Sequence, residues 1–346
     1  MNPDRQTIAV LSPLLTLAVV ALFVRGPCYA PEEVPPVRDA GVTPIRARAD
    51  AGVQPTRLRI VNGCGQPLWI FWQLGYMGGQ MPVPHQTLLS GPGDHVDYPI
   101  PDQGLAGTRF WAGYGCDSTG NNCRIGQSGG PANQGFTCPP WGCAPPIDSK
   151  FEGTFGCMPY VPEGACLLNP SSPTHDPLPR TDGWDTSAVD GFTLPYRVRV
   201  IGHCGRGPTN GVIDCSALSM ASCPTFENLS SNGQYPALSS VDMRLLTPAD
   251  AGHRPAGCYS DCARLTFSQW SGMGYTPNSP QALSYCCPTP PVTPAACSSG
   301  PVAQTGYTRL IHQQCPQVYG YAYDDGTGNW TCDAGTKYEV TFYCPR

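Results

Sequence analysis

Short apolar runs, bounded by glycine and proline, recur along the chain from residue 58 to its end. "YRVRVIGHC" (196–204) and "KYEVTFYC" (337–344) alternate large apolar and polar residues, and "LRIVNGC" (58–64), "PLWIFWQL" (67–74) and "GTRFWAGYGC" (107–116) are rich in strand-forming residues. Alternation with period two places the apolar side chains on one face of a strand. Many short strands joined by glycine and proline turns predict an all-β fold, an antiparallel sandwich.

Helical patterns are rare in the same region. "DCARLTFSQ", from Asp261 to Gln269, is the one stretch that predicts a helix, and it is short and lies among cysteines. The 40 glycines and 40 prolines also argue against long helices. No stretch between Leu58 and Arg346 resembles a linker. We therefore expect one domain, residues 57–346, with disulfide-rich loop lobes around the sandwich.

The first 56 residues have a different character. An apolar run from Ile8 to Val24 follows a short segment that carries Arg5, and the small residues Cys28 and Ala30 suit cleavage after Ala30. This pattern predicts a signal peptide over residues 1–30, with an uncleaved membrane anchor as the alternative. Residues 31–56 contain five prolines and the repeated "DAGVTPIR" and "DAGVQPTR", which predict a disordered linker.

Deletion of residues 1–56 should therefore leave a folded, soluble domain. The linker offers little apolar surface to bury, and the first strand-like run begins at Leu58. Thermal melting of the shortened chain is expected to match that of the longer one. A large fall in melting temperature would contradict the linker assignment.

Cysteine content and charge indicate the cellular compartment and the classes of ligand to expect. Nineteen cysteines indicate an oxidising compartment, so we expect a secreted, extracellular protein, or one anchored to a membrane outside the cytoplasm. Loss of Cys28 with the leader would leave an even number, consistent with no free thiol. A net charge of −5 without a Lys/Arg-rich run gives no support for nucleic-acid binding. The six scattered histidines lack metal-site spacing, so we expect no metal and no cofactor.

Several segments together resemble the thaumatin-like proteins, which include thaumatin and the pathogenesis-related antifungal proteins of plants. The matching pieces are "IVNGC", "FWAGYGCDSTGNNCRIGQSGG", "WDTSAVDGFTLP", "SYCC", "CPQVYGYAYDD" and "YEVTFYCP". Their order and spacing agree with the family across nearly all of the predicted domain. The resemblance implies a central antiparallel sandwich with disulfide-held loop lobes around it, and we expect a monomer.

The resemblance also implies a disulfide pairing. By position it gives Cys64–Cys344, Cys116–Cys123, Cys204–Cys332, Cys215–Cys315, Cys223–Cys258, Cys262–Cys286 and Cys287–Cys297. The local spacings of the four remaining cysteines suggest Cys138–Cys143 and Cys157–Cys166, for nine bridges in all. Where the family has one more cysteine, this chain has Ser128. "GQSGG" matches the nucleophile-elbow pattern G-x-S-x-G, but no strand precedes it and no helix follows, so we do not expect a catalytic serine.

The family further implies a cleft lined by an arginine and four acids. The matching acids are Glu152 in "SKFEGTF", Asp185 and Asp190 in "WDTSAVDGF", and Asp324 in "YAYDDG", with Asp325 a close rival. The arginine has no match, because the chain reads Gly113 and Tyr114 there. Clustered carboxylates raise the pKa of at least one member.

A protonated acid beside an ionised one is the requirement of glycoside hydrolysis. We assign Glu152 as the candidate acid and Asp190 as its partner, with Asp185 and Asp324 as groups that set the field or accept hydrogen bonds from sugar. Trp184 and Tyr323 are candidates for stacking on sugar rings, although both could be core residues.

Three functions compete for this site. The first is a secreted defence or antifungal protein that binds β-1,3-glucan or a related cell-wall polysaccharide. The second is a weak endo-β-1,3-glucanase that uses the same carboxylates. The third is an inhibitor of foreign glycanases, presented on disulfide-held loops. Two carboxylates alone do not fix catalytic geometry, so the first function is the expectation we carry forward.

Overall fold

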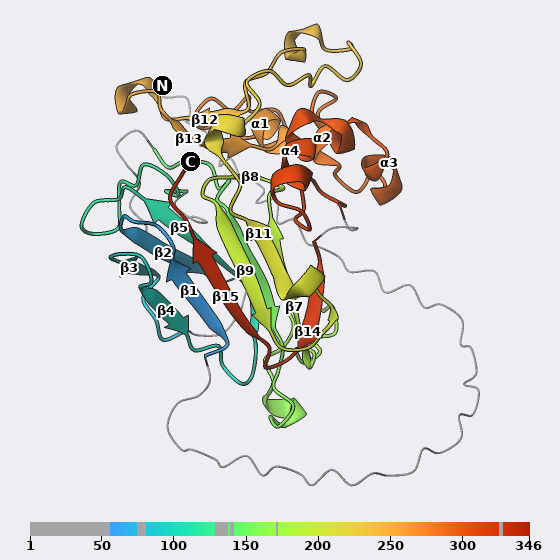
Figure 1. The fold of residues 1–346 in the computed structure, drawn as a ribbon. Coiled ribbons are helices and arrows are strands. Elements are labelled where there is room, and N and C mark those ends of the chain that lie inside the picture. The colour runs from blue at the N-terminus through green and yellow to red at the C-terminus, as the bar shows by residue number, and fades with distance from the viewer. Residues whose placement is uncertain (1–55, 75–80, 129–137, 139–141, 171, 325–327) are drawn as a thin grey trace, which may run out of the picture.

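Two β-sheets packed face to face form the body of the molecule, and a lobe of loops and short helices lies at one end (Figure 1). The computed structural model describes residues 56–74, 81–128, 138, 142–170, 172–324 and 328–346. The predicted signal peptide and all but the last residue of the predicted linker lie outside the described residues and stay predictions. The all-β fold class is confirmed.

The smaller sheet of the sandwich has five strands. In spatial order they are β11 (Val212–Cys215), β9 (Tyr196–Ile201), β15 (Lys337–Phe342), β1 (Leu58–Asn62) and β4 (His95–Tyr98). β1 and β15, which are the first and last strands along the chain, are neighbours in this sheet and pair in parallel. The other pairs in this sheet are antiparallel. β1 with β15 is thus the one parallel strand pair of the described sandwich, which is otherwise antiparallel as expected. The disulfide Cys64–Cys344 links the two segments that follow β1 and β15.

The larger sheet has seven antiparallel strands. In spatial order they are β10 (Cys204–Arg206), β14 (Trp330–Asp333), β7 (Thr181–Ser187), β6 (Lys150–Phe155), β5 (Leu105–Tyr114), β2 (Leu68–Gln73) and β3 (Gln86–Leu89). Its inner face meets the smaller sheet through aromatic side chains. The ring centroids of Phe151 and Tyr338 are 5.5 Å apart, and those of Phe110 and Tyr98 are 4.8 Å apart. All four rings are almost fully buried and form the centre of the core.

The lobe contains more helix than the sequence pattern indicates. Its small sheet consists of β12 (Arg244–Leu246), β13 (Pro255–Tyr259) and β8 (Gly191–Phe192), and its α-helices are α1 (Asp261–Thr266), α2 (Leu283–Cys286), α3 (Pro294–Ser298) and α4 (Gly306–Gln314). The predicted helix is present as α1, where the Ser260 hydroxyl accepts a hydrogen bond from the amide of Ala263. The other three were not predicted, because helices this short lack a long apolar stripe, and α3 and α4 also begin at a proline and a glycine.

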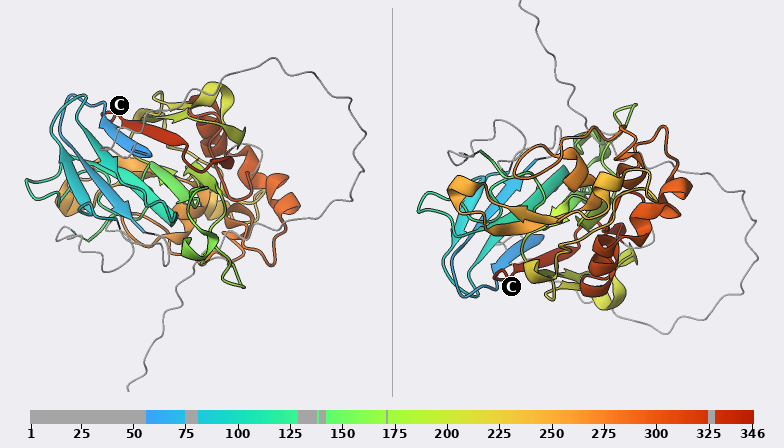
Figure 2. Two further views of the ribbon diagram at one scale, coloured as in Figure 1. Left: turned by 90° about the horizontal axis from the view of Figure 1, so that it is seen from below. Right: turned by 90° about the horizontal axis from the view of Figure 1, so that it is seen from above.

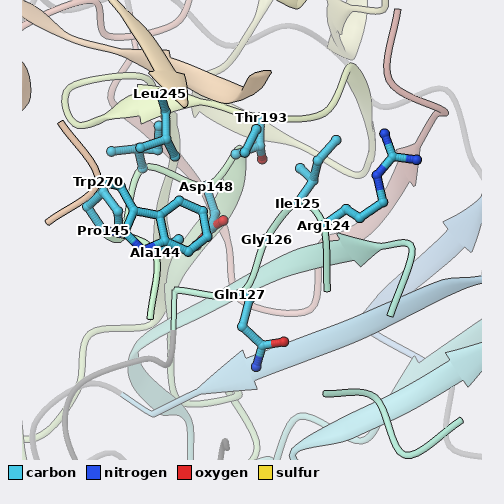
Figure 3. A pocket seen from close by; sticks show the side chains of 12 residues that line it. Arg124, Ile125, Gly126, Gln127, Ala144, Pro145, Asp148, Thr193, Leu245 and Trp270 are labelled. Carbon is cyan, nitrogen blue, oxygen red and sulfur yellow. The ribbon is translucent and has the colours of Figure 1, made fainter. Parts of the chain in front are cut away.

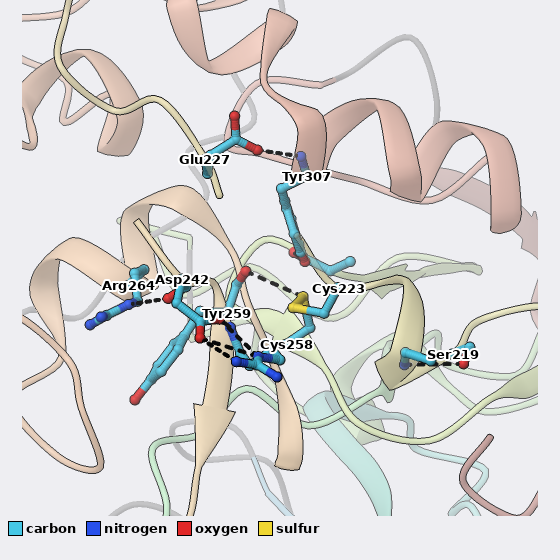
Figure 4. Close-up of a disulfide and its surroundings, with 11 residues drawn as sticks. Ser219, Cys223, Glu227, Asp242, Cys258, Tyr259, Arg264 and Tyr307 are labelled. Atoms are coloured by element: carbon cyan, nitrogen blue, oxygen red, sulfur yellow. Dashed lines mark hydrogen bonds and ion pairs between the residues drawn. A yellow bond between two sulfur atoms is a disulfide. The ribbon is translucent and has the colours of Figure 1, made fainter. Parts of the chain in front are cut away.

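Disulfides and buried polar contacts hold the lobe together. Figure 4 shows Cys223–Cys258, with Glu227 accepting a hydrogen bond from the amide of Tyr307 at 2.9 Å and Arg264 donating to the carbonyl of Asp242 at 2.7 Å.

All nine bridges that the resemblance and the local spacings suggested are present in the structure, the two local ones included. None of the helices in the described part of the chain is long and apolar enough to cross a membrane.

Candidate functional site

Three ionisable side chains lie side by side on the outer face of the seven-stranded sheet. Strand register places Arg109 of β5 opposite Glu152 of β6, and Glu152 opposite Asp185 of β7. On β6, Phe151 and Phe155 point into the core, so Glu152, between them in the alternation, points outward. The central strands of this sheet are seen together in Figure 2. The row is therefore a direct consequence of alternation and register.

Glu152 is held between two cations. Its Oε1 lies 2.9 Å from Nη2 of Arg109, and its Oε2 lies 3.9 Å from Nζ of Lys150. The side chain of Glu152 is 24% exposed and that of Arg109 is 40% exposed, so both reach solvent. Glu152 raises the pKa of Arg109, which keeps the guanidinium charged. The carboxylate therefore stays in place and remains accessible to a ligand.

Lys150 extends the charged group toward the lobe. Its Nζ lies 2.6 Å from Oδ2 of Asp190, whose main-chain oxygen accepts a hydrogen bond from the amide of Ser260 in the lobe. The Lys150 side chain is only 6% exposed. Burial opposes its charge, but Asp190 and Glu152 outweigh burial and raise the pKa of Lys150. The site thus lies where the sandwich meets the lobe.

Asp185 differs from the other carboxyls in the row. Among the described residues, no group donates a hydrogen bond to its buried Oδ1. Burial, followed by the nearby charge of Glu152, raises the pKa of Asp185 to about 8. An unpaired ionised oxygen in such a position is unfavourable, so the geometry agrees with a protonated carboxyl at neutral pH. A proton donor therefore stands next to an ionised carboxylate.

A further acid, Asp148, is buried beside this row, in the segment just before β6. Burial raises its pKa to about 6, against a hydrogen bond from Ser128 that lowers it. Figure 3 shows Asp148 at a small cavity whose far wall includes Leu245 and Trp270 of the lobe. On its other side, Asp148 lines a shallow pocket shared with Arg109 and Lys150. Ser128 is itself buried and lines the same pocket as Asp148.

Comparisons with known proteins agree with this architecture. The model of the thaumatin family matches residues 169–345, just over half of the chain. The chain belongs to the thaumatin family. It is 28% identical over 298 residues to thaumatin-like protein 1 of Pyrus pyrifolia, covering 85% of this chain and 93% of that protein.

One further relative and one solved structure found in the comparisons carry functional names. A protein of Prunus avium named glucan endo-1,3-beta-glucosidase is 27% identical over 297 residues, covering 85% of this chain and 92% of that one. The solved structure of a thaumatin-like xylanase inhibitor covers 83% of this chain and 99% of that chain, with 14% identity and a TM-score of 0.31.

The residues assigned by thaumatin-family resemblance do not all meet at this site. Glu152, Asp185 and Asp190 do, through the contacts described above. Asp324 is 7% exposed and is held by His312, whose Nε2 lies 2.7 Å from its Oδ2, and by the amide of Gly320 at 2.9 Å. Its carboxyl is therefore engaged inside the lobe. Asp325 lies outside the described residues.

The two aromatic candidates are placed unfavourably for sugar stacking. Trp184 is 2% exposed and packs on Phe151 and Tyr338 in the core. Its neighbour Asp185 points outward, so Trp184 must point inward. We correct its assignment from sugar stacking to core packing. Tyr323 is half-buried and packs against the hydrophobic core. Only part of its ring is therefore open to a sugar.

The missing family arginine has a structural explanation. A β-carbon at Gly113 would lie 2.5 Å from the ring of Phe71 and about 3 Å from both sulfurs of Cys116–Cys123. No larger side chain fits without a rearrangement of that cluster. Arg109, four residues earlier on the same strand and the same face, supplies the cation instead.

Sequence reasoning missed Arg109, Lys150 and Asp148. A usable signal was present for Lys150, because it lies two residues before Glu152 and therefore on the same face of a strand. Arg109 required the register between β5 and β6, which the sequence does not reveal.

Proposed function

We propose that the protein binds β-1,3-glucan or a related cell-wall polysaccharide across the outer face of the seven-stranded sheet. The observation that carries the proposal is the partly exposed Arg109–Glu152 pair beside Asp185. Guanidinium and carboxylate groups fixed in this way offer donors and acceptors for the hydroxyls of a sugar chain. The pocket beneath is small, so a polymer would lie across the row. Nine disulfides suit an extracellular setting and a defence role.

A second function, weak endo-β-1,3-glucanase activity, is favoured by one specific feature. Asp185 holds a proton next to Glu152, which is ion-paired and able to act as a base or nucleophile. In this assignment the Asp185 proton passes to the glycosidic oxygen as its bond to the anomeric carbon breaks. Glu152 then attacks that carbon or deprotonates the attacking water. The roles differ from the sequence-based expectation, in which Glu152 was the acid and Asp190 its partner.

Glucan retention tests the binding proposal. Replacing Arg109 or Glu152 with glutamine removes a charged hydrogen-bonding partner, so each variant should bind insoluble β-1,3-glucan about tenfold more weakly. Asp250→Asn, an exposed acid in the lobe, serves as the control and should bind like the parent. The measurement is a pull-down isotherm on the purified protein. Equal retention by all four proteins would contradict the proposal and favour the protein-directed inhibitor role.

A further inference from the structure

One buried oxygen at the edge of the candidate site lacks a hydrogen-bond donor. Gln73 is the last residue of β2, and strand register places it opposite Arg109 of β5. The alternate positions Ile70 and Trp72 belong to the core, so Gln73 points to the outer face of the sheet, as Arg109 does. Gln73 is 6% exposed, and no group among the described residues donates a hydrogen bond to its Oε1. A buried amide oxygen without a donor destabilises the fold, which points to a donor from outside the chain.

Gln73 lines the shallow pocket beside Arg109. Trp111 and Pro146 contribute apolar parts of the pocket wall, and Arg109 contributes its guanidinium. The free space is about 20 Å³, enough for one water-sized group. A whole sugar ring does not fit into this space. A single small substituent that projects from a ring does.

An exocyclic hydroxymethyl group has the chemistry that this lining requires. Its hydroxyl hydrogen is the donor that Oε1 of Gln73 lacks, and its oxygen can accept a hydrogen bond from Arg109. The guanidinium carries several N–H donors, so pairing with Glu152 does not exhaust them. The methylene of the group suits the apolar wall. The hydroxymethyl group is also what distinguishes a hexose chain such as glucan from a pentose chain such as xylan.

We propose that Gln73 is a specificity-determining residue, which binds the hydroxymethyl group of a hexose unit in this pocket. The site therefore selects hexose polymers over pentose polymers. This deepens the function proposed above, in which the row of Arg109, Glu152 and Asp185 binds the sugar chain. The relevance of Gln73 to glucan rests on that function, whereas binding of the hydroxymethyl group can be measured with a single sugar.

Side-chain amide NMR on the full chain tests the pocket directly. The amide signal of Gln73 is assigned by its absence from the spectrum of Gln73→Met. Methyl β-glucoside should shift this signal with saturation. Methyl β-xyloside lacks only the hydroxymethyl group and should bind about tenfold more weakly, because Oε1 then stays without a donor. Equal shifts with both sugars, or a shift with neither, would overturn the proposal.

Melting of the same variant shows whether the amide is kept for the fold. Gln73→Met preserves the length of the side chain and removes a buried oxygen that has no donor, so it should melt at the temperature of the parent or higher. Gln103→Met changes an exposed glutamine in the turn before β5 and should match the parent. A clearly lower melting temperature for Gln73→Met would assign the amide to the fold and overturn the proposal.

Two polymers of the same linkage test the selectivity. The parent should retain β-1,3-glucan about tenfold more strongly than β-1,3-xylan, and Gln73→Met should retain the two alike. Gln103→Met should keep the preference of the parent. Equal retention of both polymers by the parent would contradict the selectivity.

The sugar and polymer measurements also separate the pocket from the proposed function. A selective shift by the glucoside in a protein that retains no glucan would support the pocket and contradict the proposed function. Glucan retention without a selective shift would support the proposed function and overturn the role of Gln73.

Discussion

Arg57→Met is expected to lower the free energy of unfolding by about 3–5 kcal/mol, because it leaves a buried carboxylate without its cation. Arg57, just before β1, lies 2.5 Å from Asp182, whose side chain is fully buried at the start of β7. Asp182 also accepts hydrogen bonds from the amide of Gly156 and the hydroxyl of Tyr338. One carboxylate thus ties together both sheets of the sandwich.

A matched variant exists two residues further along. Arg59 pairs with Asp97 at 2.7 Å, but those side chains are 42% and 34% exposed. Arg59→Met should therefore lose at most about 1 kcal/mol. Urea unfolding with the disulfides intact measures both losses. Similar small losses in the two variants would show that burial does not distinguish the pairs.

The pH dependence of the Arg57→Met loss follows from the carboxyl. Burial raises the pKa of Asp182 above its usual value, and Arg57 opposes that rise. Without Arg57 the folded-state pKa rises further. The penalty for ionising Asp182 in the folded state is then present at neutral pH and relieved as the solution approaches pH 4. The deficit should be larger at pH 7 than at pH 4.

The fold could be predicted to a large extent because period-two alternation survives in the strands. In β15 the sequence "KYEVTF" buries Tyr338, Val340 and Phe342, the three positions that alternation assigns to one face. The parallel pairing of β1 with β15 could not be predicted, because alternation says nothing about which strands are neighbours. The short helices of the lobe are positioned by disulfides and caps, which leave little trace in a hydrophobic pattern.

The candidate site could be predicted only in part, and for a related reason. Resemblance brought Glu152, Asp185 and Asp190 together, but the ion pairs that distinguish them depend on strand register. One error was avoidable. Trp184 and Asp185 are consecutive residues of one strand and must point to opposite faces, so they could not both line the same site.

Asp185→Asn is expected to lower any glucan hydrolysis by about 100-fold or more, since a positioned acid typically contributes that much. Asparagine resembles a neutral carboxyl in size and polarity, so glucan binding should be retained. Product release from β-1,3-glucan measures the first quantity, and the pull-down isotherm measures the second. Asp333→Asn, an exposed acid on neighbouring β14, is the control and should leave both unchanged. Hydrolysis at the parental rate by Asp185→Asn would remove Asp185 from the chemistry.

The same variant carries a stability signature that needs no substrate. Because the pKa of Asp185 is raised to about 8, the folded state holds a proton that the unfolded chain releases near pH 4. Stability that depends on this proton is fully present below pH 4 and is lost as pH rises through about 8. Asparagine cannot ionise, so Asp185→Asn should melt at an increasingly higher temperature than the parent between pH 4 and pH 9. Parallel melting curves across that range would mean that Asp185 is already ionised at neutral pH and that another group holds the proton.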